Sequence, residues 1–305
     1  MKWRKLGIVY APDGKEAWAQ THAMLPTPII LKSGILRIYC AMRDAKGVGR
    51  TGYVDLNPDN PLEVLGVSQR PVLDVGVPGT FDENGTIASC VIYVGDTLYM
   101  YYAGFELGAQ IRYRILTGLA TSTDGGTTFV KHAHTPVLER SPCELFFRCS
   151  SYVHWTGDRM RMWYIGGSEW TEINGKAMPV YDLKYLESKD GKVWGDTGLT
   201  SLSLQDDEHG FGRPCIIQRS ENDYQLFFSI RKRSLGMYRL GYAESKNGLD
   251  WVRKDDQLGL DVSPSGFDSE AIMYAAPITI GDKTYLFYNG NDFGRDGFAV
   301  AERAE

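Results

Sequence analysis

Apolar and polar residues alternate along most of this chain with the period of two that is typical of β-strands. The alternating segments come in pairs joined by short turns rich in Gly, Asp, Ser or Asn, a pattern that predicts β-hairpins. Five such pairs begin at Pro26, Ser89, Ser151, Pro214 and Ala276. Aligning their second strands brings an aromatic residue to one position at spacings of 62, 62, 64 and 60 residues: Tyr39, Tyr101, Trp163, Phe227 and Phe287. The chain therefore contains five related repeats.

A third strand follows each hairpin, and in three repeats it ends in a Ser-x-Asp/Asn-Gly turn that leads to an aromatic residue. These turns run from Ser122 to Phe129, from Ser188 to Trp194 and from Ser245 to Trp251. The Asp or Asn side chain can bond to its own turn backbone, and Gly adopts positive φ without strain. We expect these turns to be structural, with the aromatic residue filling the gap between neighbouring sheets.

Fourth strands are expected in QRPVLD near Pro71 and in TPVLER near Pro136. The last repeat ends without a fourth strand, and the unassigned strand over residues 3–10 can supply the missing edge. Repeats of this length with four antiparallel strands each are typical of a β-propeller. The sequence predicts an all-β fold, a single five-bladed β-propeller domain over residues 1–305 whose ring is closed by the N-terminal strand.

Composition narrows the range of functions. The formal charge of −5 gives no basic excess for nucleic-acid binding, and no apolar run approaches the length of a membrane span. The five cysteines form no CxxC pair and are expected to be reduced thiols, which predicts a cytoplasmic protein. No metal-ligand, P-loop or dinucleotide motif occurs, so we expect no cofactor and no metal, and the sequence does not define an oligomeric state.

In a propeller, the residues just before each first strand and just after each second strand surround a central funnel. Seven positions before the aligned first strands lie Thr21, Glu83, Leu145, Glu208 and Glu270. The similar segments GTFDENG and SGFDSEA align Asp82 with Asp268 and shift this register by one residue. Several carboxylates are therefore expected to converge on one cavity.

Converging carboxylates are what glycosyl chemistry requires, because one must donate a proton to the leaving oxygen while another stays ionised. We predict catalytic roles for Asp82, Glu208 and Glu270, although acidic residues in such loops are often solvated turn formers. Predicted substrate-binding residues at the funnel are His22, Arg43, Glu83, Arg148, His209, Arg213, Arg231, Asp268 and Asn291. Arginines there suit a sugar that bears phosphate or carboxylate, but Arg148 and Arg213 can equally form buried structural ion pairs.

The histidines divide by position. His22 and His209 occupy equivalent places at the funnel, where His22 is expected at the rim and His209 as either a proton carrier or a rim residue. His132 and His134 lie on a presumed outer strand, and no catalytic role is expected for them.

The blade phrase GTFDENG…VIYVGDTLYMYYAG…TGLATSTDGGTTF…PVLER, with its echo SGFDSEA…ITIGDKTYLFYNG, resembles the five-bladed propeller glycoside hydrolases. That group includes arabinanases, xylosidases, the invertase group and the mannoside phosphorylases. The resemblance implies three carboxylates from different blades, which act as base or nucleophile, pKa modulator and acid. The chain departs from it at THAMLPTP, where the first blade has His22 and Thr27 but no carboxylate before its strand.

Three functions follow from these observations. The first is a glycoside hydrolase-like enzyme that cleaves or transfers a glycosidic or sugar-phosphate bond, with a carbohydrate or sugar phosphate as its small-molecule partner. The second is a non-catalytic carbohydrate-binding propeller, which the missing first-blade carboxylate favours. The third is a platform for protein interactions, which would need an exposed apolar patch.

Overall fold

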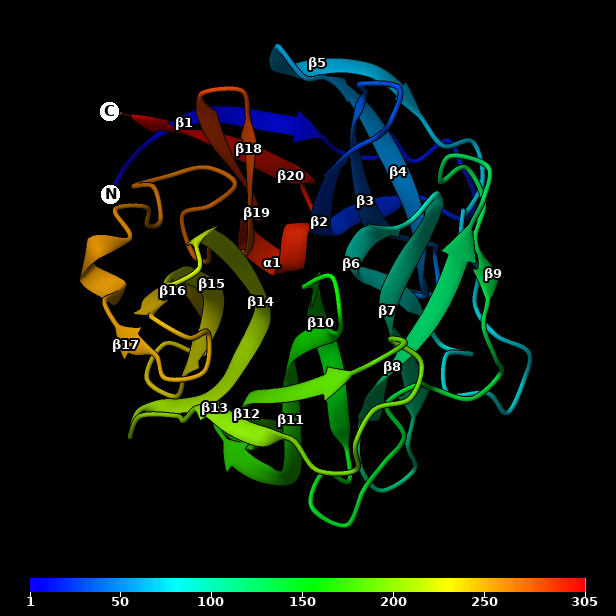
Figure 1. Cartoon of the computed structure of the whole chain (residues 1–305), viewed down its shortest axis with the longest axis vertical. Coiled ribbons are helices and arrows are strands. Elements are labelled where there is room, and N and C mark those ends of the chain that lie inside the picture. The colour runs from blue at the N-terminus through cyan, green and yellow to red at the C-terminus, as the bar shows by residue number, and fades with distance from the viewer. Residues whose placement is uncertain (305) are drawn as a thin grey trace.

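The prediction of an all-β chain is confirmed by the structure, a computed structural model that describes residues 1–304. Its helical segments are the 3₁₀ turn Asp255–Gln257 and the short helix α1 (Asn291–Gly294). No helix within residues 1–304 is long and apolar enough to cross a membrane. The strands lie in groups around a central region, and the two ends of the chain lie side by side (Figure 1).

Four consecutive strands make up each of the first four groups. The first group is β2 (Thr21–Ile30), β3 (Leu36–Arg43), β4 (Gly49–Asn57) and β5 (Asn60–Val67). The second is β6 (Thr86–Val94), β7 (Thr97–Leu107), β8 (Tyr113–Ser122) and β9 (Val130–Lys131). The third is β10 (Phe147–Trp155), β11 (Met160–Ile173), β12 (Lys176–Ser188) and β13 (Leu199–Leu202). The fourth is β14 (Glu208–Ser220), β15 (Asp223–Lys232), β16 (Tyr238–Ser245) and β17 (Val252–Arg253).

The last group combines the two ends of the chain. It contains β18 (Met273–Ile280), β19 (Lys283–Asn289), β20 (Phe298–Ala304) and the N-terminal strand β1 (Lys2–Tyr10). β1 pairs antiparallel with β20, from Lys2 opposite Ala304 to Tyr10 opposite Phe298. The first strands of successive groups contact one another in the order β2, β6, β10, β14 and β18, and β18 contacts β2. These five strands surround the centre of the molecule (Figure 1).

The expected fourth strands near Pro71 and Pro136 are wrong. The outer strands are β5 and β9, which precede these segments in the chain. Leu73 and Leu138 form isolated bridges to Thr51 and Thr117, and both leucines are buried. A proline has no N–H for a strand ladder, so each Pro-Val-Leu segment contributes buried side chains rather than a sheet edge.

Three of the five aromatic residues that align the repeats connect one group of strands to the next. Tyr39 Oη donates to the carbonyl of Gly126 at 2.9 Å, and Tyr101 Oη donates to that of Gly191 at 2.9 Å. Trp163 Nε1 donates in the same way to Gly248 at 2.7 Å. Each acceptor glycine lies in one of the predicted Ser-x-Asp/Asn-Gly turns, with φ of 80°, 70° and 74°. We call these contacts the inter-sheet clasps.

The turns are structural, as expected. Ser122, Ser188 and Ser245 each accept a hydrogen bond through Oγ from the backbone N–H of the clasp glycine. The aromatic residue that ends the turn also packs across the gap between groups. Phe129 lies edge-on to Tyr39 with ring centroids 5.5 Å apart, and Trp194 lies edge-on to Tyr101 at 6.2 Å.

Arg213 spans the centre of the molecule. It lies on β14, is 2% exposed, and has a positive φ of 24°. Its guanidinium donates to the Pro26 carbonyl, to Thr27 Oγ1 at 2.9 Å and to the Ser89 carbonyl at 3.3 Å. These acceptors belong to β2 and β6, whereas the neighbours of β14 among the first strands are β10 and β18. Arg213 therefore connects opposite sides of the central region.

The clasps predict a measurable loss of stability in Tyr101→Phe. The variant keeps the ring but removes one of the two donors to the buried Gly191 carbonyl, the other being Trp194 Nε1 at 3.1 Å. The free energy of unfolding should therefore fall by about 1 kcal/mol. Urea unfolding measures this change. Tyr99→Phe, on the same strand but only partly buried, is the matched control and should unfold like the parent. Equal stability of all three proteins would contradict the role given to the clasps.

Candidate functional site

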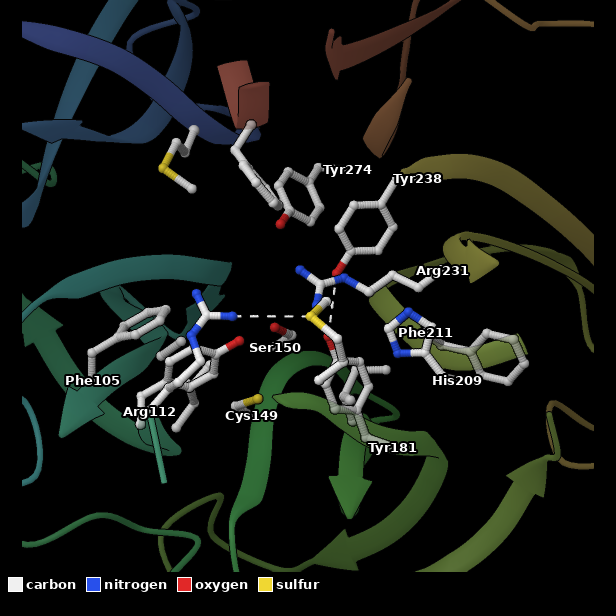
Figure 2. Close-up of a pocket in the computed structure, with 18 of the residues that line it drawn as sticks. Phe105, Arg112, Cys149, Ser150, Tyr181, His209, Phe211, Arg231, Tyr238 and Tyr274 are labelled. Atoms are coloured by element: carbon white, nitrogen blue, oxygen red, sulfur yellow. Dashed lines mark hydrogen bonds between the residues drawn. The ribbon is translucent and has the colours of Figure 1, made fainter. Parts of the chain in front are cut away.

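A cavity of about 1030 Å³ lies at the centre of the molecule and collects side chains from every group of strands. Figure 2 shows aromatic rings and guanidinium groups around it. Its polar and aromatic lining residues are Arg43, Phe105, Arg112, Tyr113, Ser150, Asn174, Lys176, Tyr181, His209, Phe211, Arg231, Tyr238, Tyr274, Asp292 and Phe293. The cavity brings functional groups from all five groups of strands together around open space.

Three arginines give the cavity a positive charge. Arg43 ends β3, Arg231 lies near the end of β15, and Arg112 precedes β8. The Arg112 and Arg231 side chains reach into the cavity from different walls (Figure 2). Within residues 1–304, none of the three guanidinium groups forms an ion pair with a carboxylate. Their charge is therefore available to a bound anion.

Tyrosines surround Arg231. Its guanidinium carbon lies 4.6 Å from the ring centroid of Tyr238, a cation–π contact, and Tyr238 Oη lies 3.3 Å from Tyr181 Oη. Burial raises the pKa of Tyr181 and of Tyr274 well above the usual value. These phenols stay protonated at neutral pH, so they act as hydrogen-bond donors and acceptors rather than as anions.

His209 presents a defined tautomer to the cavity. Its Nδ1 lies 3.0 Å from the carbonyl oxygen of Pro179, and because a carbonyl only accepts, Nδ1 carries the proton. Nε2 then has a free lone pair. Burial lowers the pKa of His209, and the Pro179 carbonyl opposes this shift. At neutral pH His209 is a neutral ring that can accept a hydrogen bond or a proton.

His22 lies beside Arg43 at one side of the cavity. Arg43 donates to His22 Nε2 at 3.4 Å, and His22 Nδ1 lies 2.9 Å from Thr21 Oγ1. Burial and the charge of Arg43 together lower the pKa of His22 to about 4. The ring is therefore neutral at pH 7, and the positive charge of the cavity comes from its arginines and Lys176.

Among the lining residues of the described chain, Asp292 is the one carboxylate. It lies in α1 with φ of 49° and ψ of 44°, the left-handed region that a residue other than glycine adopts only at some cost. Asp292 lies 3.5 Å from Arg295, and its negative charge also acts on His22 and Arg43. A pair of carboxylates, as ordinary glycoside hydrolysis uses, does not line this cavity.

The carboxylates predicted to be catalytic lie outside the cavity. Asp82 is buried against Lys131 at 2.6 Å and accepts a hydrogen bond from Tyr102 Oη at 2.9 Å. Glu208 is buried and receives two hydrogen bonds from Arg253, at 2.8 and 2.9 Å. These contacts show that both residues form buried ion pairs within the fold. The catalytic roles of Asp82 and Glu208 stay predictions.

The same arrangement recurs in two further repeats. Asp268 pairs with Lys5 at 2.6 Å, and Glu144 pairs with Arg148 at 2.7 Å. Tyr288 Oη donates to Asp268 at 3.1 Å, as Tyr164 Oη does to Glu144 at 2.6 Å. These acids follow the spacing of the aromatic register and are Asp82, Glu144, Glu208 and Asp268. The contacts thus favour the register that aligns Asp82 with Asp268.

The remaining predicted residues divide between the cavity and its surroundings. Arg43, His209 and Arg231 line the cavity, whereas Glu270 is exposed and does not. Asn291 Oδ1 accepts hydrogen bonds from the backbone N–H groups of Glu270 and Ala271, so it orders the loop. Glu83 accepts from the Gly79 N–H.

Sequence reasoning missed Arg112, Lys176 and the four cavity tyrosines. Arg112 lies in the connection between β7 and β8, and Lys176 begins β12 after a turn. At such positions no alternation of apolar and polar residues indicates which way a side chain points. Tyr274 lies on β18 with φ of 59°, so an alternating pattern misjudges its orientation. The unusual length of the hairpin over residues 160–188 was the one available signal.

The fold is that of the β-propeller glycoside hydrolases. A solved structure named "Glycoside hydrolase" matches with a TM-score of 0.74, covering 99% of this chain and 91% of that chain at 18% identity. A structure from work on the GH130 family of mannoside phosphorylases, which contains glycoside hydrolases that target beta-1,2 mannosidic linkages in Candida mannan, matches at 0.72, covering 98% and 93% at 14% identity. A mutant Bombyx mori GH32 beta-fructofuranosidase in complex with sucrose matches at 0.61, covering 93% and 61% at 14% identity.

In sequence, no family model matches the chain. It is 30% identical over 305 residues to two proteins of Mycobacterium tuberculosis, with 99% of each chain covered. They are Uncharacterized protein MT1551 of strain CDC 1551 and Uncharacterized protein Rv1502 of strain H37Rv. The chain belongs to the family of these two mycobacterial proteins.

The ion pair of Asp82 predicts that Asp82→Asn is mainly a stability variant. Replacing the charge leaves Lys131 without its buried partner, so the free energy of unfolding should fall by about 3 kcal/mol. Chemical denaturation measures the loss. Asp96→Asn, which removes an exposed pairing with Lys32 of the first group of strands, serves as the control and should change little. A fully stable Asp82→Asn protein would show that the pair is not structural.

The lowered pKa of His22 predicts a contribution to acid sensitivity. The unfolded chain protonates this ring near pH 6.5, whereas the folded protein does so only near pH 4. Stability from this group is therefore present above pH 6.5 and is lost as pH falls towards 4. In unfolding measured across this range, His22→Gln should lose less stability than the parent, while exposed His134→Gln should follow the parent. Identical profiles for His22→Gln and the parent would contradict this role.

Proposed function

We propose that the protein is a five-bladed propeller, closed by β1, that acts on a carbohydrate bound in the central cavity. The cyclic contacts of the five first strands and the pairing of β1 with β20 support this architecture. Sugar ligands are supported by the structural neighbours, one of which was solved with sucrose and another of which is named for mannosidic linkages. All five cysteines are free thiols, which is consistent with a reducing cytoplasm.

The substrate is a sugar phosphate, and the charge of the cavity carries this part of the proposal. Arg43, Arg112 and Arg231 supply three cations, whereas Asp292 is the single lining carboxylate of the described chain. Cleavage of an ordinary glycoside needs an acid to protonate the leaving oxygen and a second carboxylate on the other side of the sugar. A phosphate departs as an anion, so guanidinium groups replace the acid.

The transfer step balances with groups that line the cavity. The bond from the anomeric carbon to the phosphate oxygen breaks, and the electron pair leaves with the phosphate, held by Arg112 and Arg231. A new bond forms between the anomeric carbon and the oxygen of water or of an acceptor hydroxyl. The proton of that hydroxyl goes to Nε2 of His209, and the Pro179 carbonyl stabilises the resulting imidazolium through Nδ1. Asp292 stabilises the positive charge that develops on the sugar ring.

A non-catalytic sugar-binding protein is the second candidate, and the same single carboxylate favours it. Such a protein binds the sugar phosphate without turning it over. The two candidates therefore share their binding behaviour and differ in product formation.

Arg112→Met and Arg231→Met test the proposal. A panel of glycosyl phosphates and nucleotide sugars, with phosphate release and product sugar as readouts, should yield at least one substrate. Each variant should lower turnover by about 100-fold or more, since a charge that stabilises the leaving group is lost. Arg159→Met, on the exposed pair with Glu187, is the control and should keep the parent rate.

The outcomes separate the alternatives. Binding of a sugar phosphate with no turnover would support the non-catalytic candidate. Turnover of uncharged glycosides in preference to sugar phosphates, unchanged in both arginine variants, would contradict the proposed role of the phosphate.

A further inference from the structure

Much of the cavity wall is apolar. Besides its aromatic rings, the cavity is lined by aliphatic and sulfur-containing side chains, which are Met24, Leu25, Ile87, Ala103, Ile115, Cys149, Ile165, Ile173, Ala177 and Met178. A sugar presents several hydroxyl groups that each need hydrogen-bond partners, and aliphatic carbon supplies none. The cavity is therefore larger and more apolar than one charged sugar requires.

The polar groups of the cavity match a sugar phosphate alone. Among the lining residues of the described chain, the side chains that can accept a hydrogen bond are Asp292, Asn174, Ser150, His209 and the tyrosines Tyr113, Tyr181, Tyr238 and Tyr274. The arginines account for an anion, and these acceptors for the hydroxyls of one sugar. The aliphatic wall is left without a counterpart in a free sugar phosphate.

One hairpin extends this apolar wall to the mouth of the cavity. β11 and β12 have 14 and 13 residues, against 11 or fewer in the corresponding strands β7, β15 and β19. The extension ends at a turn where Ile173 pairs with Lys176, and both residues line the cavity. Ala177 and Met178 continue the lining along β12.

Exposed apolar side chains continue from the wall onto the surface. Leu107 is 61% exposed and pairs across the sheet with Tyr113, which lines the cavity. Leu235 and Met237, 46% and 40% exposed, flank the lining residue Gly236. Together with Ile173 and Met178 they form what we call the apolar rim. Large exposed side chains that continue an apolar cavity wall indicate a ligand that passes between the two.

We propose that the substrate is an amphiphile: a sugar phosphate whose phosphate is esterified to a lipid chain, with the chain leaving the cavity over the apolar rim. This inference rests on the proposed function, and it specifies what the phosphate is joined to. Arg112 and Arg231 hold the phosphate, and Asp292 faces the sugar. The hydrocarbon contacts the aliphatic wall, then Leu235 and Met237. Burial of each methylene raises affinity by up to roughly fourfold.

Alkyl phosphates without a sugar test this inference, because they contain only the anion and the hydrocarbon chain. Calorimetry measures the binding of four ligands to the full-length protein, each below its micelle concentration: inorganic phosphate, butyl phosphate, octyl phosphate and dodecyl phosphate. Affinity should rise by at least 100-fold from butyl to dodecyl phosphate. Dodecyltrimethylammonium, a cation with the same chain, should not bind, which separates a defined site from detergent adsorption.

Two sets of variants show where the alkyl chain and the phosphate of the ligand bind. The double variant Leu235→Ser, Met237→Ser should weaken dodecyl phosphate by at least tenfold and leave butyl phosphate unchanged. Arg231→Met should weaken all the organic phosphates. Val193→Ser together with Val252→Ser, at exposed apolar positions away from the rim, is the matched control and should bind like the parent.

Failure of this inference and failure of the proposed function give different results. If the phosphates bind with an affinity that does not depend on alkyl-chain length, the inference of a lipid chain is wrong, and the sugar-phosphate proposal stands. Chain-dependent binding that is equal for alkyl phosphate and alkylammonium, and is unchanged by the rim variant, would also overturn it. If no phosphate binds while neutral alkyl glycosides do, the phosphate of the proposed function is wrong.

Discussion

The clasp from one sheet to the next is the interaction on which the rest of the structure depends. A buried ring on a second strand donates to a glycine carbonyl in the following repeat, and that glycine has the positive φ that exposes its carbonyl to the ring. The donor and the acceptor are about 90 residues apart in sequence, so the three contacts fix the first four groups of strands against one another. The cavity lies where these groups meet at the centre of the molecule.

Buried carboxylates also hold strands in place in this protein. Asp82 and Asp268 precede first strands, Glu208 begins one, and each binds a basic residue of an outer strand. A buried charge is tolerated when it is paired and hydrogen-bonded, and all three meet that condition. Because these acids are occupied in this way, Asp292 is the one carboxylate of the described chain that lines the cavity with the arginines. The cavity is thus positively charged because most of the nearby acids pair with basic residues outside it.

Much of the fold can be predicted from the sequence, since hairpin alternation and the aromatic register depend on local rules. The Ser-x-Asp/Asn-Gly turns were also predicted, and the clasps confirm their structural role. The segments near Pro71 and Pro136 were misjudged because apolar residues beside a proline are buried by packing without joining a ladder. The resemblance to propeller glycoside hydrolases holds at the level of the fold.

The site was predicted less well, for a physical reason. Arg43, Arg231 and His209 follow or precede regular strands, so their positions could be counted from the repeat. Arg112 and Tyr274 depend on a connection and on a bulged strand, where one residue more or less reverses the direction of a side chain. Asp82 and Glu208 lie outside the cavity because each pairs with a basic residue of an outer strand, a partner that the repeat does not reveal.

Arg213 has a consequence for movement at the centre of the molecule. Its buried guanidinium ties β14 to β2 and β6, which lie across the central region from it. Sliding of one side past the other would break hydrogen bonds to a buried charge, which are among the stronger ones in a protein. The innermost strands therefore resist relative motion.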